Sequence, residues 1–413
     1  MTSADKMILG LALIVGSILV VAVILFSLPN PSAQYVPENG SRSFSQVTGS
    51  SDFIPSETEH KPLWIYKAGG PVYSVALSAD GAYIGAGKDS PNSTTGITEG
   101  RIIYLQKNGS LLWDQRPDID LSSYKTMKSL ALSEDGYRIA ALIDHGWHYT
   151  VACFVRNGTL VSKFGTRDWM GKNIVTDKTG QMIVSSGTKE IVSTDPSGNA
   201  RWRYTTGGLG GSKDSQDFTG VHVAISGDGQ HIAAVSEDSY LYYLDYQNGN
   251  LLWKYDTGHS LQTVAMSYFG RYIAAASRNH NIYYFNDDGV LLWNFTLDGV
   301  PETVAINEDG RFLAVGSDDN SISILDRNGT LIREFKTGGP VESVAISRDG
   351  QTIIAGSDDD TIYCLDRTGS LLWNYTTGGI VKSVAVSSDG QYIVAGSYDG
   401  NLYFFNRDRI DNT

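Results

Sequence analysis

Aspartates recur along this sequence at spacings that could place several carboxylates around a metal ion. One set precedes a glycine in each case: Asp80, Asp135, Asp228, Asp309, Asp349 and Asp389. A second set is clustered: Asp318, Asp319, Asp358, Asp359, Asp360 and Asp399. Calcium needs roughly six to eight oxygen ligands that converge on one point. Aspartate also forms turns by accepting hydrogen bonds from its own backbone, and its repetition along the chain favours that role, so we expect no metal site.

Two histidines and two cysteines are the other residues that could do chemistry. His145 and His148 are three residues apart, a spacing that could bind zinc on a helix, but turn residues surround them and no third ligand is evident. Cys153 and Cys364 form neither a CxxC pair nor a disulfide framework. The sequence has no P-loop and no GxSxG motif. These patterns favour a protein that is not an enzyme and has no cofactor.

Charge and composition exclude further classes of protein. The chain has 45 acidic and 32 basic residues and a net charge of -13, which argues against nucleic acid as the main partner. Charged residues make up only 19% of its 413 residues and hydrophobic residues 41%. A disordered chain or a coiled coil would be richer in charge, so these values indicate a packed fold.

An apolar segment near the N-terminus predicts a membrane anchor. Residues 7–28 are 22 residues without a charge, enough for a helix across a bilayer core of about 30 Å. Lys6 precedes the segment and Arg42 is the first basic residue after it, so we expect a cytoplasmic tail, residues 1–6, and an extracytoplasmic remainder in a single-pass protein of the cell membrane. Cleavage near Ala33 is the alternative. Residues 29–61 are rich in Pro, Ser and Gly and predict a flexible linker.

Seven N-x-S/T sequons agree with an extracytoplasmic location and could make the protein a glycoprotein, although Asn-Gly is also common in turns. They begin at Asn39, Asn92, Asn108, Asn157, Asn294, Asn328 and Asn374.

From residue 62 onwards the sequence repeats itself about every 40 residues, in eight copies. In the last complete copy, four alternating runs are separated by turn residues: Val341–Ser347, Thr352–Gly356, Ile362–Asp366 and Leu371–Tyr375. This pattern predicts four antiparallel strands per copy. The fold class is therefore all-β, an eight-bladed β-propeller of four-stranded antiparallel blades over residues 62–407, with an N-terminal transmembrane helix and a C-terminal tail, residues 408–413.

The two ends of the repeat region are incomplete and complement each other. The last copy stops after its third strand, residues 401–406, and the region begins with an isolated fourth strand, residues 62–67. We expect residues 62–67 to complete the last blade, because an open ring would leave unpaired strand edges. This strand would run from the bottom to the top face, so the linker would enter at the bottom.

The segment from Leu365 to Trp373 resembles the tryptophan-docking repeat of the quinoprotein (PQQ-like) family, and the AxSxDG segments resemble WD40-like repeats. The resemblance covers about residues 62–407 and implies a propeller, commonly with eight blades. Quinone-dependent dehydrogenases carry an adjacent cysteine pair and carboxylates around calcium. This sequence lacks the cysteine pair, so it resembles the non-catalytic branch, which includes scaffolds of membrane-protein assembly and of cell surfaces.

Tryptophans at one position of the repeat are expected to pack between blades rather than to bind a ligand. They are Trp64, Trp113, Trp202, Trp253, Trp293 and Trp373.

Insertions in the early copies predict where a partner would bind. They fall at residues 88–100, 114–126, 144–148 and 207–220, all in connections that a propeller places on its top face. Loops on a rigid scaffold often carry binding residues, although these could also be neutral drift in a tolerant surface. The candidate binding residues on and beside them are Tyr124, His145, Trp147, His148, Trp169 and Phe218.

A second candidate surface is the top rim of the channel. The residues at the mouths of the first strands are Tyr73, Lys128, Lys172, Val221, Gln262, Glu302, Glu342 and Lys382. Lysines in the second and third copies and glutamates in the sixth and seventh predict an uneven charge, and an anionic ligand would prefer the lysine side. A solvated rim without a ligand is the alternative.

These observations together predict a membrane-anchored extracytoplasmic scaffold that binds another protein or a cell-envelope component. A PQQ- or calcium-dependent oxidoreductase and a glycan-binding surface lectin are the alternatives. A small-molecule ligand is not expected.

Overall fold

The computed structural model describes residues 9–15, 18–24, 60–91, 98–117, 126–145, 148–165, 171–207 and 220–408. The chain divides into two compact units, Met1–Ser56 and Glu57–Thr413.

In the first unit, β1 (Leu9–Val15) and β2 (Ile18–Ile24) pair as antiparallel strands. Strands therefore occupy these parts of the segment 7–28, in which a helix was expected. Short runs of Val, Ile and Leu suit a strand as well as a helix, so hydropathy alone does not discriminate between the two. Among the residues that the structure describes, no helix is long and apolar enough to cross a membrane.

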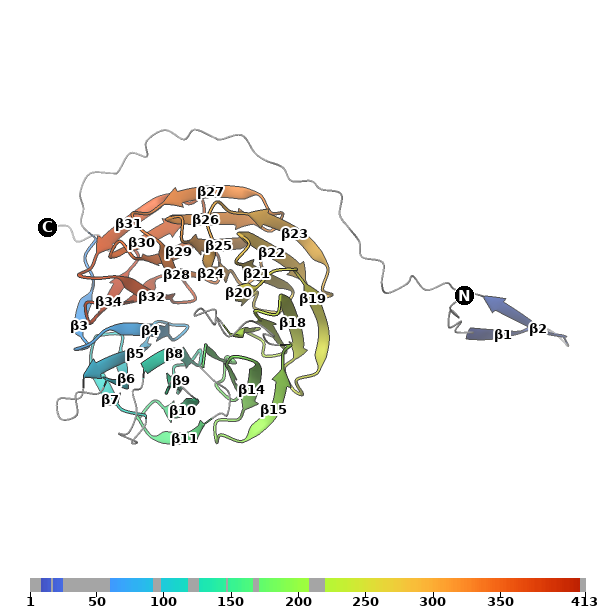
Figure 1. Ribbon diagram of the computed structural model, residues 1–413, viewed down its shortest axis with the longest axis horizontal. Coiled ribbons are helices and arrows are strands. Elements are labelled where there is room, and N and C mark those ends of the chain that lie inside the picture. The colour runs from blue at the N-terminus through green and yellow to red at the C-terminus, as the bar shows by residue number, and fades with distance from the viewer. Residues whose placement is uncertain are drawn as a thin grey trace. The chain divides into compact units, whose positions relative to one another are not determined.

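The second unit is an all-β propeller, and its described residues form eight four-stranded antiparallel blades, which confirms the architecture predicted from the repeat (Figure 1). Blade 1 contains β4 (Val72–Leu77), β5 (Tyr83–Pro91), β6 (Thr98–Gln106) and β7 (Leu111–Gln115). Blade 2 contains β8 (Thr126–Leu132), β9 (Arg138–Asp144), β10 (Tyr149–Val155) and β11 (Leu160–Gly165). Blade 3 contains β12 (Ile174–Thr176), β13 (Ile183–Ser186), β14 (Glu190–Thr194) and β15 (Ala200–Thr205). Blade 4 contains β16 (His222–Ile225), β17 (His231–Val235), β18 (Tyr240–Asp245) and β19 (Leu251–Asp256).

The later blades are more uniform in length. Blade 5 contains β20 (Leu261–Met266), β21 (Tyr272–Ser277), β22 (Asn281–Asn286) and β23 (Leu291–Thr296). Blade 6 contains β24 (Pro301–Ile306), β25 (Phe312–Ser317), β26 (Ser321–Asp326) and β27 (Leu331–Lys336). Blade 7 contains β28 (Val341–Ile346), β29 (Thr352–Ser357), β30 (Thr361–Asp366) and β31 (Leu371–Thr376). Blade 8 contains β32 (Val381–Val386), β33 (Tyr392–Ser397), β34 (Asn401–Asn406) and β3 (Trp64–Lys67).

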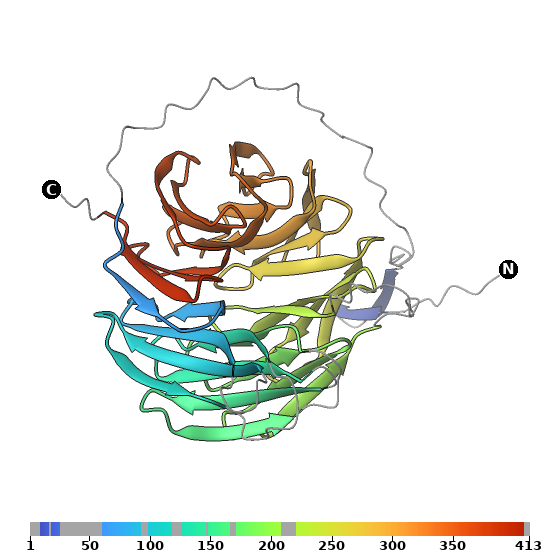
Figure 2. The same ribbon diagram turned by 60° about the vertical axis from the view of Figure 1, so that its left-hand side comes forward.

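The ring is closed by β3, which pairs antiparallel with β34 although the two strands lie at opposite ends of the propeller sequence (Figures 1 and 2). Trp64 lies opposite Phe404, and Lys67 opposite Asn401. The first strands of neighbouring blades are in contact around the whole circle, from β4 through β8, β12, β16, β20, β24, β28 and β32 back to β4. These inner strands surround the central channel.

The core lies between neighbouring blades, since both faces of each sheet are covered. Blades 7 and 8, for example, bury Trp373, Val381 and Phe405 against one another. Blades 8 and 1 bury Phe404, Val72 and Ile84 in the same way. Apolar side chains on both faces of a sheet explain why its central strands read as nearly continuous hydrophobic runs.

Each repeat tryptophan lies against the blade that follows it in the ring. The indole nitrogens donate hydrogen bonds to carbonyls of the next blade, Trp64 to Lys107 (2.8 Å), Trp113 to Arg156 (2.9 Å), Trp202 to Tyr246 (2.9 Å), Trp253 to Asp287 (2.7 Å), Trp293 to Arg327 (2.7 Å) and Trp373 to Arg407 (3.1 Å). The ring of Trp293 also covers Gly329, where a Cβ would lie 2.9 Å from it and where φ is +78°. Tryptophan and glycine are therefore required together.

Blade 8 lacks the turn that receives the tryptophan elsewhere, because its third and fourth strands come from opposite ends of the domain. His60 takes that place. Its ring stacks on Trp373 at 4.3 Å between centroids, and its Nε2 lies 2.9 Å from the carbonyl oxygen of Asn406. The repeat pattern could not show this contact, since His60 lies before the first repeat.

Candidate binding site at the channel mouth

Connections between second and third strands define what we call the top face, and turns between first and second strands define the bottom face. Near the top end of the first strands in blades 1, 2, 5, 6, 7 and 8, the pairing register shifts and skips one residue. The skipped residues are Tyr73, Lys128, Gln262, Glu302, Glu342 and Lys382. A bulge of this kind re-aims a side chain and is frequent near binding sites.

The rim rests on a ring of hydrogen bonds between neighbouring first strands. The residue after the rim position accepts a backbone N–H of the next blade, as Ser74 does from Leu130 (3.0 Å) and Ser383 from Val75 (3.0 Å). The same bond joins Asn173 to Val223 (3.1 Å) and Ser343 to Val384 (3.2 Å). These bonds fix the height of each rim residue relative to its neighbours.

The bottom mouth of the channel is crossed by an ion pair. Arg348, in the bottom turn of blade 7, donates to Glu134, in the bottom turn of blade 2, at 2.7 Å. The guanidinium also lies 4.9 Å from the ring centroid of Tyr268 of blade 5. Side chains from three blades therefore meet at the bottom mouth of the channel.

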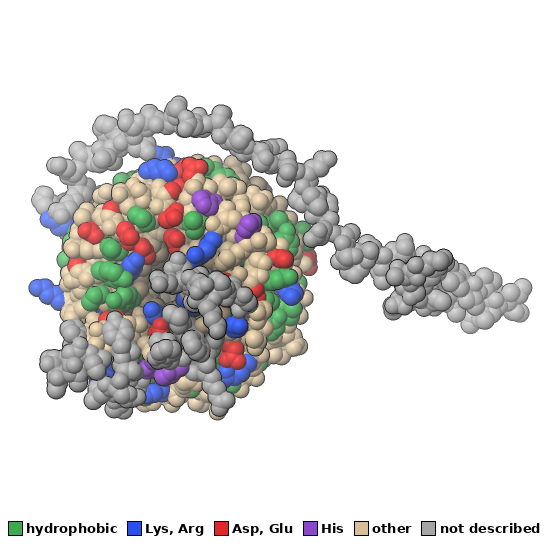
Figure 3. All heavy atoms as spheres, in the orientation of Figure 1, with side chains coloured by type: hydrophobic (Ala, Val, Ile, Leu, Met, Phe, Trp, Pro, Cys, Tyr) green, Lys and Arg blue, Asp and Glu red, His purple; other side chains and the backbone are tan. Residues whose placement is uncertain are grey.

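Carboxylates dominate the rim over blades 6 and 7. Gln262 donates to Glu302 at 2.7 Å, and Lys382 lies 2.6 Å from Glu342 and 3.9 Å from Asp358. Burial and the nearby charges of Asp318 and Glu342 raise the pKa of Glu302. Burial and Glu342 raise the pKa of Asp358. On the face shown in Figure 3, acidic side chains (red) gather over the part of the ring that contains β26, β28 and β30.

On the lysine side of the rim, positive and negative charges are more nearly equal in number. Lys128 lies 3.7 Å from Asp144. Burial and Lys128 lower the pKa of Lys172, while Glu237 and Asp144 act in the opposite direction. Burial and Lys172 lower the pKa of His222 to about 4, so this channel histidine is neutral at pH 7. The uneven charge that the sequence predicted is therefore present, but its excess is negative.

Asp89 is a rim residue that the sequence did not single out. It is 3% exposed, its Oδ1 accepts the N–H of Met127 (2.9 Å), and its Oδ2 has no hydrogen-bond partner among the residues that the structure describes. Burial raises the pKa of Asp89 to about 6. Alignment of the repeats could have found it, because Asp89, Asp318 and Asp358 share one position: each donates its backbone N–H to the residue just before the first strand, Pro71, Val300 and Pro340 respectively.

The remaining predicted binding residues have mixed positions. His145 is buried, stacks on His148 at 4.5 Å and lies 3.0 Å from Thr150, so it supports the loop between β9 and β10. His148 is exposed. Tyr124, Trp147, Trp169 and Phe218 lie outside the described residues. The insertion at residues 88–100 extends β5 and β6, with Pro91 opposite Thr98.

The repeated aspartates bond to their own turns. Asp80 accepts from the Ser78 hydroxyl (2.7 Å) and from the Ala82 N–H (2.9 Å), and five further blades repeat this pattern or a close variant of it. Asp359 accepts from Tyr363 (2.5 Å) and from Gly338 N–H (2.6 Å). These carboxylates shape turns.

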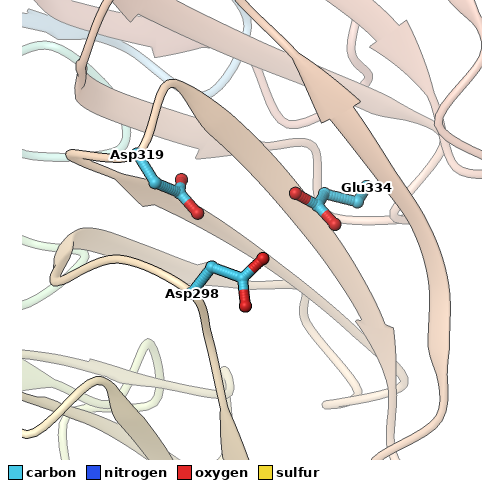
Figure 4. A group of neighbouring side chains, drawn as sticks. All are labelled: Asp298, Asp319 and Glu334. Atoms are coloured by element: carbon cyan, nitrogen blue, oxygen red, sulfur yellow. The ribbon is translucent and has the colours of Figure 1, made fainter. Parts of the chain in front are cut away.

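One acidic group among the described residues brings three carboxylates within 4.8 Å of one another, Asp298, Asp319 and Glu334 (Figure 4). Lys336 forms ion pairs with Glu334 and, at 3.8 Å, with Asp319. The ammonium group of Lys336 therefore already occupies this cluster and offsets part of its negative charge.

The five described sequon asparagines are all exposed: Asn108, Asn157, Asn294, Asn328 and Asn374. Asn39 and Asn92 lie outside the described residues.

The buried carboxyl group of Asp89 predicts a pH-dependent stability that Asp89→Asn removes. Its pKa is higher in the folded than in the unfolded chain, so stability is fully present below about pH 4 and is lost as pH rises towards 6. We expect the free energy of unfolding of Asp89→Asn minus that of wild type to rise by about 1–2 kcal/mol between pH 4 and pH 7. Urea denaturation at the two pH values measures this, and a pH-independent difference would contradict it.

Comparison with protein families gives two matches. A family described as "Outer membrane protein assembly factor BamB" matches residues 98–311, slightly more than half of the chain. A family of unknown function (DUF5711) matches residues 221–402. No curated protein sequence matches.

Many solved structures are similar to the propeller. A structure of Sqt1 from Chaetomium thermophilum, bound to the N-terminus of the ribosomal protein L10, has a TM-score of 0.67 and 17% identity and covers 84% of this chain and 100% of its own. Another Sqt1 structure from this organism has a TM-score of 0.67 and 16% identity and covers 84% and 98%. At this identity the similarity shows the fold alone. The chain therefore belongs to the PQQ-like β-propeller family whose description is "Outer membrane protein assembly factor BamB", since that family matches residues 98–311 and the chain has eight blades with docked tryptophans.

Proposed function

We propose that this protein is a membrane-anchored extracytoplasmic scaffold that binds another protein through its top face and has no enzymatic role. The observation that carries the proposal is the top rim. There, bulged first strands present charged side chains, and buried acceptors at Asp89, Gln262 and Asp358 lack a hydrogen bond within the described ranges of the chain. A buried acceptor without a partner is costly in a folded protein, so a retained group of them points to a ligand that supplies donors.

The finer form of the proposal includes the loops of the early blades. His148, Lys128 and Lys172 lie at the top of blades 2 and 3, next to the insertions expected to bind. Sqt1, a protein of similar fold, gives an example of such binding, since its structure was solved with the N-terminus of a ribosomal protein bound. A rigid ring that presents variable loops suits this role.

The proposed anchor is the apolar segment 7–28, as a single-pass helix with its N-terminus in the cytoplasm. Within a bilayer, an isolated pair of strands would leave the hydrogen-bonding groups on its outer edges unsatisfied, whereas a helix satisfies them internally. His60, the first described residue of the propeller, contacts Asn406 at the bottom end of β34.

Photo-crosslinking tests the binding face. Tyr398 at the top of blade 8 is 37% exposed, and Phe269 at the bottom of blade 5 is 50% exposed. We replace each with p-benzoylphenylalanine in the full chain, in its native membrane, and irradiate. Both positions carry exposed aromatic rings, so they are matched for exposure to a crosslinking partner. Because the proposed partner contacts the top face, we expect a protein adduct from position 398 and none from position 269. Adducts from position 269 alone would contradict top-face binding.

Cysteine labelling tests the location. Cys153 and Cys364 are 3% and 0% exposed, and burial raises the pKa of Cys153 to about 11, so both react slowly with maleimides. Gln247→Cys adds an exposed thiol in the turn between β18 and β19. We expect a membrane-impermeant maleimide to label this variant in intact cells and to leave wild type unlabelled. Labelling only after lysis would show that the propeller faces the cytoplasm.

A further inference from the structure

Five carboxylates lie at the top ends of blades 6, 7 and 1, around the channel mouth, and we call this group the acidic arc. It consists of Glu302 and Asp318 of blade 6, Glu342 and Asp358 of blade 7, and Asp89 of blade 1. Blade 8 lies between blades 7 and 1 and contributes Lys382 and Tyr398. Burial raises the pKa of Tyr398, and the nearby charges of Glu342, Asp358 and Asp89 add to this effect.

The arc already holds one cation of the chain itself, and this contact shows what chemistry it accepts. The ammonium of Lys382 lies 2.6 Å from Glu342, 3.9 Å from Asp358 and 5.4 Å from the ring centroid of Tyr398. Tyr73 packs edge-on against Tyr398 at 5.2 Å. Carboxylates beside an aromatic face form a typical environment for an ammonium or guanidinium group.

One lysine does not satisfy the arc. Asp89 Oδ2, Gln262 Oε1 and Asp358 Oδ1 are buried acceptors without a hydrogen bond in the described part of the chain, and Asp89 is 3% exposed. Burial raises the pKa of Asp89, Glu302 and Asp358, and neighbouring carboxylates add to this effect at Glu302 and Asp358. Arg278, at the edge of the arc, only partly offsets the effect at Glu302.

The spacing of these groups argues against a single metal ion. Among the described residues, the one set of three His, Cys, Asp or Glu side chains whose ligand atoms lie within 4.8 Å of one another is Asp298, Asp319 and Glu334, and none of these belongs to the arc. A calcium ion needs several oxygens at about 2.3–2.6 Å from one point. Acceptors spread over blades 5, 6, 7 and 1 instead suit a ligand with several separate donors.

We propose that the acidic arc binds a basic peptide segment of the partner protein, whose Lys or Arg side chains reach Glu302, Asp318, Asp358 and the oxygens of Asp89 and Gln262 that lack a hydrogen bond among the described residues. This inference deepens the proposed top-face function and rests on it. The sequence predicted that an anionic ligand would prefer the lysine side, or that the rim is solvated and holds no ligand. A basic ligand differs from both expectations, and Lys128 and Lys172 have acidic neighbours of their own.

The test measures the affinity of the detergent-solubilised full chain for fluorescent hexalysine by anisotropy at low ionic strength, with hexaglutamate as the control peptide. Glu302→Gln/Asp318→Asn removes two charges of the arc. Glu308→Gln/Asp309→Asn removes two charges from the bottom turn of the same blade. We expect hexalysine affinity to fall about tenfold in the first variant and less than about twofold in the second.

Lys382→Met gives the opposite readout. It frees Glu342 and Asp358 from their internal cation, so we expect hexalysine to bind about threefold more tightly or better. A loss of folding could not produce this gain. No hexalysine binding, equal losses in both double variants, or weaker binding by Lys382→Met would overturn the proposal, as would calcium binding that depends on Glu302 without any preference for hexalysine.

The two proposals fail separately. If photo-crosslinking from position 398 captures a partner while hexalysine does not bind, the top face is the contact surface and the basic segment is wrong. If hexalysine binds and position 398 yields no adduct, the arc recognises basic groups but the top-face scaffold is not supported.

Discussion

The hydrogen bonds between β3 and β34 hold the first and last blades together, and every other feature of the propeller depends on this closure. Without it, blades 8 and 1 would lose the buried contacts of Phe404, Val72 and Ile84, and β34 would expose an unpaired edge. Closure also fixes the direction of β3, which distinguishes the bottom face, where the propeller begins, from the top face.

Closure alone does not fix the positions of the residues at the channel mouth. Contacts that recur between neighbouring blades fix them. Tryptophans fix the outer edge of a blade to the next, as Trp293 does at Arg327, while serines and asparagines join the inner strands, as Ser74 does at Leu130. A side chain just above that inner ring is held at a defined height. The backbone and the inner hydrogen bonds recur in most blades, whereas the rim residues differ from blade to blade. Binding specificity is therefore expected to depend on the residues that differ between repeats.

The sequence was sufficient for the number of blades, because a period of about 40 residues and four alternating runs leave few alternatives. Strand alignment also identified most rim residues, since a bulge recurs at one position. It could not find Asp89 or the contact of Lys382 with Glu342, because these depend on where side chains meet across blades. His60 was missed because it lies outside the repeat. The apolar segment 7–28 was ambiguous between helix and strand on composition alone.

A disulfide between β3 and β34 tests the closed ring most directly. Lys67 and Asn401 are directly opposite residues of the two strands, and both native cysteines are buried and unpaired. In Lys67→Cys/Asn401→Cys, the closed ring predicts an intramolecular disulfide under mild oxidation and a higher thermal midpoint of unfolding than in the reduced protein. Failure to form this bond, or bonds only between molecules, would contradict the closure and with it the assignment of the two faces.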